Sequence, residues 1–185
     1  MPPSLPWTET ALLIPVPHVD PIVGEHRRAL DPAAADGIPA HVTALYPFIP
    51  LERITARDHA ELEHVIGAVP TIPISDARTA WFGDQVLYLE LDRPGPVHAL
   101  ITRLADAFPD APPFAGRIAV EDIVPHVTIG QDRPLEELER AAHDVETQLP
   151  WSQVLDRVEL WAGPPVAGRT APAAWSVQQS YSLGR

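Results

Sequence analysis

Hydrophobic positions along the chain fall into short runs with either a two-residue or a helical period, and prolines mostly stand at the ends of these runs. Alternation predicts strands, whereas apolar positions three or four residues apart predict helices. In the first half this pattern predicts a strand at 9–17, a helix at 20–30, a short strand at 40–46, a helix at 55–69 and a strand at 71–82. In the second half it predicts a strand at 85–91, a helix at 96–108, a short strand at 125–130, a helix at 132–149, and strands at 154–161 and 174–183.

The order of strand, helix, short strand, helix and strand therefore occurs twice. We also expect a loop at 33–39, a further short strand at 117–120, and a capping box from Thr55 to Asp58. The helix at 132–149 is expected to bury Leu135, Leu138, Ala142, Val145 and Leu149. We predict an α+β fold of two pseudo-symmetric lobes, each a mostly antiparallel sheet backed by helices, facing each other across a central cleft. Residues 1–185 should form a single bilobal domain with intertwined lobes.

The amino-acid composition limits the type of protein and the partners that we expect. The chain has 185 residues, of which 45 % are hydrophobic, which suits a globular domain with a sizeable core. No apolar run approaches the roughly 18 residues of a membrane span. The chain has no cysteine for disulfides, thiolate zinc sites or a cysteine nucleophile, so we expect a cytoplasmic protein. The net charge of −12 argues against long duplex or long RNA partners, but allows a small phosphate ligand or an RNA end in a local pocket.

Two short segments share one pattern of histidine, apolar residue, threonine and apolar residue. They are His41-Val42-Thr43-Ala44 and His126-Val127-Thr128-Ile129, one in each half of the chain. Because successive side chains of a strand point to opposite faces, the histidine and the threonine of each segment share one face. A single copy would usually be structural. Two copies in matching positions predict that both faces meet around one ligand.

A pair of histidines and a pair of hydroxyls suit the hydrolysis of a phosphodiester. Imidazole exchanges protons near neutral pH, so one histidine can take a proton from water while the other protonates the departing sugar oxygen. Threonine hydroxyls can donate hydrogen bonds to the non-bridging phosphate oxygens. This chemistry needs no metal. A zinc site from His41, His126 and a carboxylate such as Asp122 is an alternative, although no known zinc spacing is present.

Other residues are weaker candidates for the pocket. Six further histidines in predicted loops and helices are expected to be solvated or structural: His18, His26, His59, His64, His98 and His143. Tyr46 is predicted to line the pocket with its hydroxyl in contact with solvent, and Arg133 is a candidate phosphate ligand. Trp81 is a candidate for base stacking, whereas Phe48 and Trp161 are expected in the core.

The two motifs resemble the paired His-hydrophobic-Thr/Ser-hydrophobic signatures of the 2H phosphoesterase superfamily. The likeness is closest to its branch of 2′-5′ RNA ligases and RNA 2′,3′-cyclic phosphodiesterases, which Tyr46-Pro47-Phe48, Pro125 and the ending from Trp175 to Gly184 also resemble. The resemblance implies a bilobal fold with a central cleft and metal-independent hydrolysis of cyclic phosphates or 2′-linked phosphodiesters. By motif position it also implies His41 and His126 as the acid–base pair, and Thr43 and Thr128 as the phosphate ligands.

We therefore predict a phosphodiesterase without a metal or other cofactor that hydrolyses a 2′,3′-cyclic phosphate on a nucleotide or an RNA end. One alternative is an enzyme that hydrolyses or ligates 2′-5′ linkages, or that acts on another cyclic phosphate such as an ADP-ribose derivative. Another is a nucleotide-binding module without turnover, against which the four intact motif positions argue. We expect a monomer that binds neither long duplex nucleic acid nor a membrane.

Overall fold

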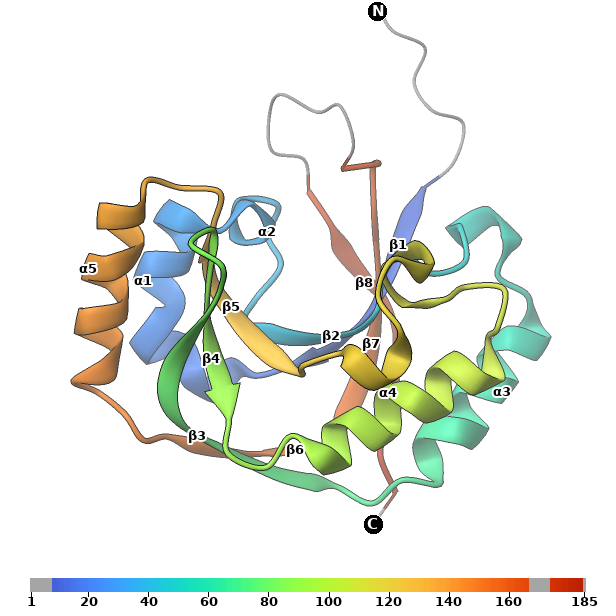
Figure 1. The fold of residues 1–185 in the computed structure, drawn as a ribbon. Helices are drawn as coiled ribbons and strands as arrows, with labels where there is room; N and C mark the ends of the chain where they lie inside the picture. Colours follow the sequence, from blue (N-terminus) through green and yellow to red (C-terminus); the bar gives the residue numbers. More distant parts are fainter. Residues whose placement is uncertain (1–7, 167–173, 185) are drawn as a thin grey trace, which may run out of the picture.

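The computed structural model describes residues 8–166 and 174–184, and its strands alternate with helices (Figure 1). The first half contains β1 (Glu9–Pro15), α1 (Asp20–Leu30), α2 (Pro32–Ala35), β2 (His41–Leu45), α3 (Ala56–Gly67) and β3 (Ile72–Phe82). The second half contains β4 (Val86–Leu91), α4 (Gly95–Ala107), β5 (His126–Gln131), α5 (Leu135–Glu146), β6 (Ser152–Leu155), β7 (Arg157–Gly163) and β8 (Ser176–Ser182). The predicted repeat of element order is therefore present.

The two strands that carry the motifs lie at the centre of the sheet. The strand order is β6-β3-β4-β5-β2-β1-β7-β8, and neighbouring strands are antiparallel. Within the described residues, β2 and β5 pair only at Val42 and Val127, so two four-stranded halves meet at a single ladder position. The predicted α+β class and antiparallel sheet are confirmed, and the arrangement is consistent with two lobes.

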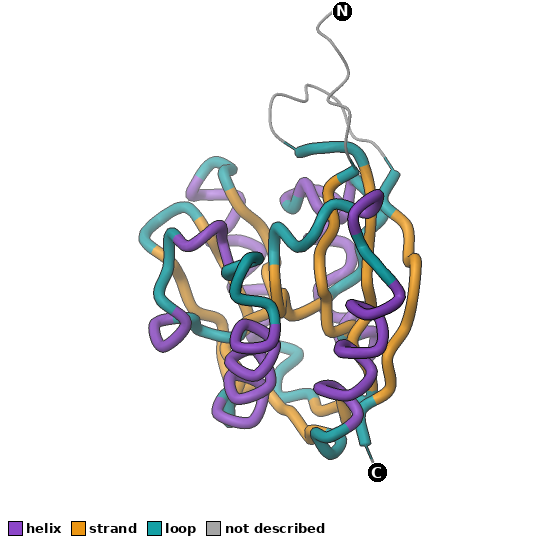
Figure 2. Tube along the Cα trace, turned by 90° about the vertical axis from the view of Figure 1, so that its right-hand side faces the viewer, coloured by secondary structure: helices purple, strands orange, loops and turns teal. Residues whose placement is uncertain are grey.

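The helices cross between the two halves of the sheet. α1 follows β1 but packs on β5 and against α5, whereas α4 follows β4 but packs on β2 and against α3. Figure 1 shows α1 with α5 at one end of the molecule and α3 with α4 at the other, and the same helices can be traced in purple in Figure 2. Each half of the chain therefore supplies a helix that covers the central strand of the other half.

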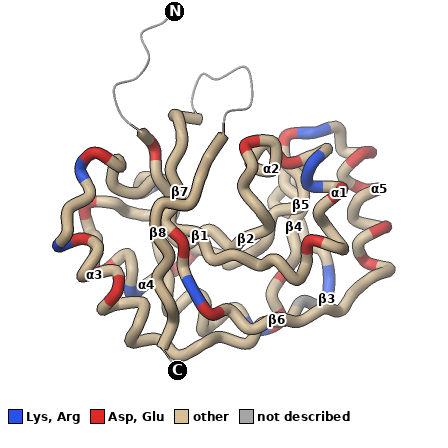
Figure 3. Tube along the Cα trace, turned by 180° about the vertical axis from the view of Figure 1, so that it is seen from behind, with Lys and Arg blue, Asp and Glu red and all other residues tan. Residues whose placement is uncertain are grey.

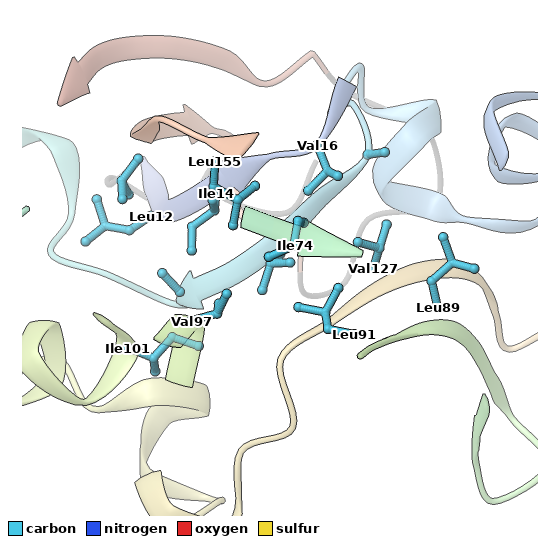
Figure 4. Close-up of a cluster of buried hydrophobic side chains, with 14 of the residues drawn as sticks. Leu12, Ile14, Val16, Ile74, Leu89, Leu91, Val97, Ile101, Val127 and Leu155 are labelled. Carbon is cyan, nitrogen blue, oxygen red and sulfur yellow. The ribbon is translucent and has the colours of Figure 1, made fainter. Parts of the chain in front are cut away.

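The central strands alternate between the core and the opposite face. In both motifs the two apolar residues are buried, while the histidine and the threonine are half-buried. Figure 4 shows Val127 in the core among side chains of neighbouring strands and of α4. Burial of such an aliphatic side chain contributes about 1.5–3 kcal/mol, which fixes which face of the strand is turned inward. The inward valines thus oblige the histidines to face outward from the core.

Three local predictions were wrong. The expected loop at 33–39 begins instead with the short helix α2, because Asp31 caps it by accepting a hydrogen bond from the backbone N–H of Ala33 at 3.1 Å. The expected strand at 117–120 is absent, because Arg117 has αR backbone at the end of a 3₁₀ turn at 113–116 and Val120 begins another 3₁₀ turn at 120–122. The single strand expected at 154–161 is β6 and β7, which separate at Asp156.

Helix boundaries and faces followed the pattern more closely. The capping box is present at Thr55, whose hydroxyl accepts from the backbone N–H of Asp58, while the Asp58 carboxylate accepts from the backbone N–H of Thr55. In α5 the predicted residues Leu138, Ala142 and Val145 are buried, but Leu135 is 45 % exposed, and Leu149 is only half-buried and lies beyond the end of the helix at Glu146. Leu135 is the first residue of α5 and follows the exposed residues 132–134.

Acidic side chains dominate the surface. Figure 3 shows Asp and Glu along α5 and α3, where they outnumber the arginines. The net charge of −12 is therefore spread over the surface rather than confined to one tail. Among the described residues, none of the helices has the length and apolar character needed to cross a bilayer.

Candidate active site

The two motifs meet on one face at the centre of the sheet. Because β2 and β5 are antiparallel with their motif valines opposite each other, the register places each histidine across from the threonine of the other strand. His41, Thr43, His126 and Thr128 all line one pocket, whose volume is about 490 Å³. The histidines thus occupy one diagonal of a four-residue arrangement, and the threonines occupy the other.

Each imidazole is held by the carbonyl group two residues earlier. Nδ1 of His41 donates to the carbonyl oxygen of Pro39 at 2.7 Å, and Nδ1 of His126 donates to that of Val124 at 2.7 Å. Because a carbonyl oxygen only accepts, each Nδ1 carries a proton, and the neutral ring keeps its lone pair on Nε2. Both Nε2 atoms can therefore accept a proton and, once protonated, can donate one.

Burial favours the neutral form of both imidazoles. Burial, followed by the positive charge of Arg27, lowers the pKa of His41 from 6.5 to about 4. Burial also lowers the pKa of His126, against the opposing effect of its hydrogen bond to Val124. Both rings are consequently neutral at pH 7 in the free protein. A bound anion would favour protonation of either ring, because an opposite charge stabilises the imidazolium.

Aromatic side chains from β3 and β4 enclose His126. The rings of Phe82 and Tyr88 are stacked with centroids 4.2 Å apart, and each centroid lies 5.0 Å from that of His126. Phe82 also lines the pocket. The sequence pattern did not identify these neighbours, because the contact depends on the pairing of β4 with β5.

Tyr46 lies in the pocket lining, as its position beside the first motif suggested. Its hydroxyl donates to Oε2 of Glu9 at 2.8 Å, and its ring meets that of Trp175 edge-on with centroids 6.3 Å apart. Trp175 lines the same pocket together with apolar side chains such as Leu13 and Ile38. This wall of the pocket is therefore largely apolar and faces the polar motif residues.

The arginine at the pocket is not the one that the sequence suggested. Arg133 is exposed and is not among the residues that line the pocket, whereas Arg117 is. Nε of Arg117 donates to the carbonyl oxygen of Phe114 at 3.1 Å. Phe114, Ala115 and Gly116 all have positive φ, and this turn brings Arg117 to the pocket. Because a strand was expected at 117–120, this turn was not predicted. The prolines at 112 and 113 could have indicated it.

The other aromatic and histidine candidates lie elsewhere. Phe48 and Trp161 are buried in the core as predicted, and Trp81 packs against the core rather than lining the pocket. Among the histidines, all within the described part of the chain, only the two motif residues line the pocket. His59 instead shares a hydrogen bond of 2.7 Å with the hydroxyl of Tyr181, which fits the predicted structural role.

The donor groups around the pocket do not form a metal cluster in the described residues. Asp122, the carboxylate considered for a zinc site, does line the same pocket as the two histidines. However, the described part of the chain contains no group of three or more His, Cys, Asp or Glu side chains arranged to hold a metal ion. The geometry of these donors therefore gives no support to the zinc alternative.

The sequence of this chain is similar to those of two named proteins. A protein of Geobacillus thermodenitrificans named "Putative phosphoesterase" is 26 % identical over 151 residues, covering 80 % of each chain. A protein of Geobacillus kaustophilus with the same descriptive name is 24 % identical over 176 residues, covering 94 % of each.

Solved structures share the fold at lower identity. The crystal structure of a phosphoesterase matches with a TM-score of 0.61 and 16 % identity, covering 97 % of this chain and 99 % of the other. Escherichia coli LigT in complex with 3′-AMP matches with a TM-score of 0.59 and 15 % identity over the same shares. The family model described as the 2′-5′ RNA ligase superfamily matches residues 15–163. Because that match spans most of the chain, the protein belongs to the 2′-5′ RNA ligase superfamily, as the likeness of its motifs to those of the 2H phosphoesterases indicated.

Proposed function

We propose that this protein hydrolyses a 2′,3′-cyclic phosphate on a nucleotide or an RNA end without a metal, with His41 and His126 as the acid–base pair. Membership of the superfamily and the names of the relatives support a phosphodiesterase-type activity in general. The observation that carries the finer proposal is the pair of imidazoles in one pocket, each with Nδ1 bound to a backbone carbonyl and Nε2 left for chemistry.

In the proposed reaction, water attacks phosphorus, a new P–O bond forms, and the bond from phosphorus to one ring oxygen breaks. The neutral Nε2 of one histidine accepts a proton from the water, and the protonated Nε2 of the other gives a proton to the departing sugar oxygen. The product is a phosphomonoester, and exchange with solvent restores the protonation states. The hydroxyls of Thr43 and Thr128, on the other diagonal, donate to the non-bridging oxygens where charge develops.

The charge of the pocket favours a small substrate. Its volume of about 490 Å³ lies within the range of sites for small molecules. Arg117 is the only arginine among the described residues that line it, while Asp31, Asp36 and Asp122 are also present. A single phosphodiester group suits this balance better than a polyanion, given the net charge of −12. Escherichia coli LigT, which shares this fold, forms crystal complexes with 3′-AMP, ATP and NADP⁺, so a nucleotide suits a protein of this architecture.

The roles of the remaining candidates follow from their positions. We propose that Tyr46 forms the wall against the nucleoside part of the substrate, and that Arg133 contacts phosphate only when a substrate extends beyond the pocket. We further propose that the two halves act as one bilobal unit and as a monomer, because β2 and β5 of a single chain together build the pocket.

A second candidate function is hydrolysis or ligation of 2′-5′ linkages, which the name of the superfamily favours. The same histidines would serve, because a 2′-linked phosphodiester also needs one proton removed and one supplied. The two candidates differ in the leaving group, which is part of the same ribose in a cyclic phosphate and belongs to the next nucleoside in a 2′-5′ linkage.

The test is an assay of the purified protein with EDTA against 2′,3′-cyclic mononucleotides, a 2′-5′ dinucleotide and the matched 3′-5′ dinucleotide. We expect turnover of the cyclic substrates, and its loss in His41→Ala and His126→Ala. His143→Ala is the matched control, because that side chain is exposed on α5 outside the pocket. Turnover of the 2′-5′ dinucleotide alone would favour the second candidate. Activity that EDTA abolishes and added metal restores would refute the metal-free reaction, and binding without turnover would identify a nucleotide-binding module.

A further inference from the structure

A buried ion pair lies at the edge of the pocket, which Asp31 lines and Arg27 does not. Arg27 is 3 % exposed and Asp31 is 2 % exposed, and Nη2 of Arg27 lies 2.7 Å from Oδ2 of Asp31. They stand four residues apart where α1 ends. Removing two charges from water costs several kcal/mol per ion, so a buried pair is maintained only with further hydrogen bonds. The partners of these two side chains therefore indicate what the pair does.

Arg27 binds the backbone next to both motifs. Its Nε donates to the carbonyl oxygen of Thr128 at 3.1 Å, within the second motif. Its Nη1 and Nη2 each lie 3.4 Å from the carbonyl oxygen of Ile38, to which they donate. Ile38 immediately precedes Pro39, whose carbonyl holds the ring of His41. One guanidinium thus joins the strand of the second histidine to the segment that orients the first.

Asp31 extends the same network to the end of β5. Its Oδ1 accepts from the backbone N–H of Ala33 at 3.1 Å and from Nε2 of Gln131 at 3.2 Å. The helix can approach β5 this closely because residue 130 is glycine. A Cβ atom there would lie 2.7 Å from Cβ of Leu30, nearer than real Cβ atoms approach. Gly130 therefore allows α1 to pack closely on β5, and this packing places Arg27 within hydrogen-bond distance of the carbonyl oxygen of Thr128.

We propose that Arg27 is a positioning residue that fixes the two motifs relative to each other. The inference rests on the proposed function for its kinetic consequence, but the positioning itself is structural. Within the described residues, β2 and β5 pair at one ladder position only, so the backbone alone constrains their separation weakly. The guanidinium supplies additional links between the two strands, and its rigid fork fixes distance and angle together in a way that the single ammonium of a lysine does not.

The test compares Arg27→Met, Arg27→Lys and the double variant Arg27→Met/Asp31→Asn. The double variant avoids the unpaired buried carboxylate that destabilises the single one, while its amide oxygen can still accept from Ala33. With a 2′,3′-cyclic mononucleotide we expect kcat to fall roughly 10–100-fold in the methionine variants, because a displacement of about 1 Å can cost about 10² in rate. KM should change less, and Arg27→Lys should recover only part of kcat.

Histidine NMR titration supplies a second readout that loss of stability would not move. Burial is the main cause of the lowered pKa of His41; the charge of Arg27 lowers it further, the hydrogen bond to Pro39 and the charge of Asp31 raise it, and His126 lowers it. In Arg27→Met the pKa of His41 should therefore rise toward 6.5. The double variant also removes the carboxylate that raises this pKa, so the rise there should be smaller. Arg157→Met is the control, because Nε of Arg157 pairs with Glu159 at 2.8 Å outside the pocket.

The outcomes separate the two proposals. A folded double variant with wild-type kcat overturns the positioning role whatever its His41 titration, even if Arg27→Met does not fold. An equal loss of kcat in the Arg157→Met control also overturns it, because the effect would then be general. If the wild-type protein turns over none of the phosphodiesters, the proposed function fails. The geometry of the motifs in the folded double variant then decides on Arg27: loss or weakening of the NMR contacts between β2 and β5 across the pair Val42 and Val127 supports the role, and contacts equal to those of the wild type reject it.

Discussion

The half-buried imidazole of His41 should make the folded protein less stable in mild acid, and replacing His41 should remove that part of the pH dependence. The substitution is His41→Asn, whose side-chain amide can keep the donor to the carbonyl of Pro39. Burial and the charge of Arg27 hold the pKa of His41 at about 4 in the folded state, against 6.5 in an unfolded chain. Between these values the unfolded chain binds a proton that the folded protein does not. Stability therefore rises with pH across this window, and this contribution is lost as pH falls.

The magnitude follows from the two pKa values. Each pH unit of difference corresponds to about 1.36 kcal/mol, so the difference between 6.5 and about 4 gives about 3 kcal/mol. At pH 7 this penalty is absent, and near pH 4 almost all of it is present. Carboxylates such as Asp58 and Glu90, whose hydrogen bonds to Thr55 and Arg78 lower their pKa, add their own loss of stability in acid. The difference between wild type and variant isolates the contribution of His41.

The assay is urea unfolding followed by circular dichroism from pH 7.5 to pH 4 for both proteins. The free energy of unfolding of the variant, relative to wild type, should improve by about 3 kcal/mol over this range. His126→Asn should show a change of the same sign, because burial also lowers the pKa of His126. If the curves of wild type and His41→Asn ran parallel throughout, His41 would titrate normally in the folded protein, and the inferred environment of its ring would be wrong.

Further predictions concern the reaction and the packing beneath it. His41→Ala and His126→Ala should each lower kcat by roughly 10²–10⁴, and the double variant should be barely worse because both protons move in one step; additive losses in steady-state kinetics would contradict this. The profile of kcat/KM against pH should be bell-shaped with its maximum below 6.5, since burial lowers the pKa of both histidines. A rate that rises steadily to pH 10 would exclude the pair. Thr43→Val should weaken both turnover and the binding of inorganic phosphate by calorimetry without unfolding the protein, and unchanged values would remove this hydroxyl from the site. Gly130→Ala should destabilise the fold by about 1–3 kcal/mol, because its Cβ would meet Leu30 at 2.7 Å; an unchanged midpoint in urea would show that α1 is not packed this tightly.

Much of the fold and the centre of the site could be read from the sequence because their signals are local. The alternation within each motif requires only that one face of a strand be buried, and the valines at 42 and 127 fix that face in each strand. Capping at Thr55 is likewise decided within one turn of helix. The repetition of the motif was enough to predict a shared pocket, since two strands with the same exposed pair in matching positions suggest a common ligand. Burial then placed these residues as the pattern indicated.

Tertiary structure alone decided which distant residues surround that centre. Phe82 and Tyr88 reach His126 only because β4 pairs with β5, and Arg117 replaces Arg133 at the pocket because three successive residues with positive φ turn the chain. Arg27 had no distinguishing signal beyond its spacing from a nearby carboxylate, and that spacing is common on exposed helices. Its contacts with both motifs depend on α1 crossing to the other half of the sheet. The physical reason is that periodicity and capping act over a few residues, whereas register and helix crossing depend on how the whole core packs.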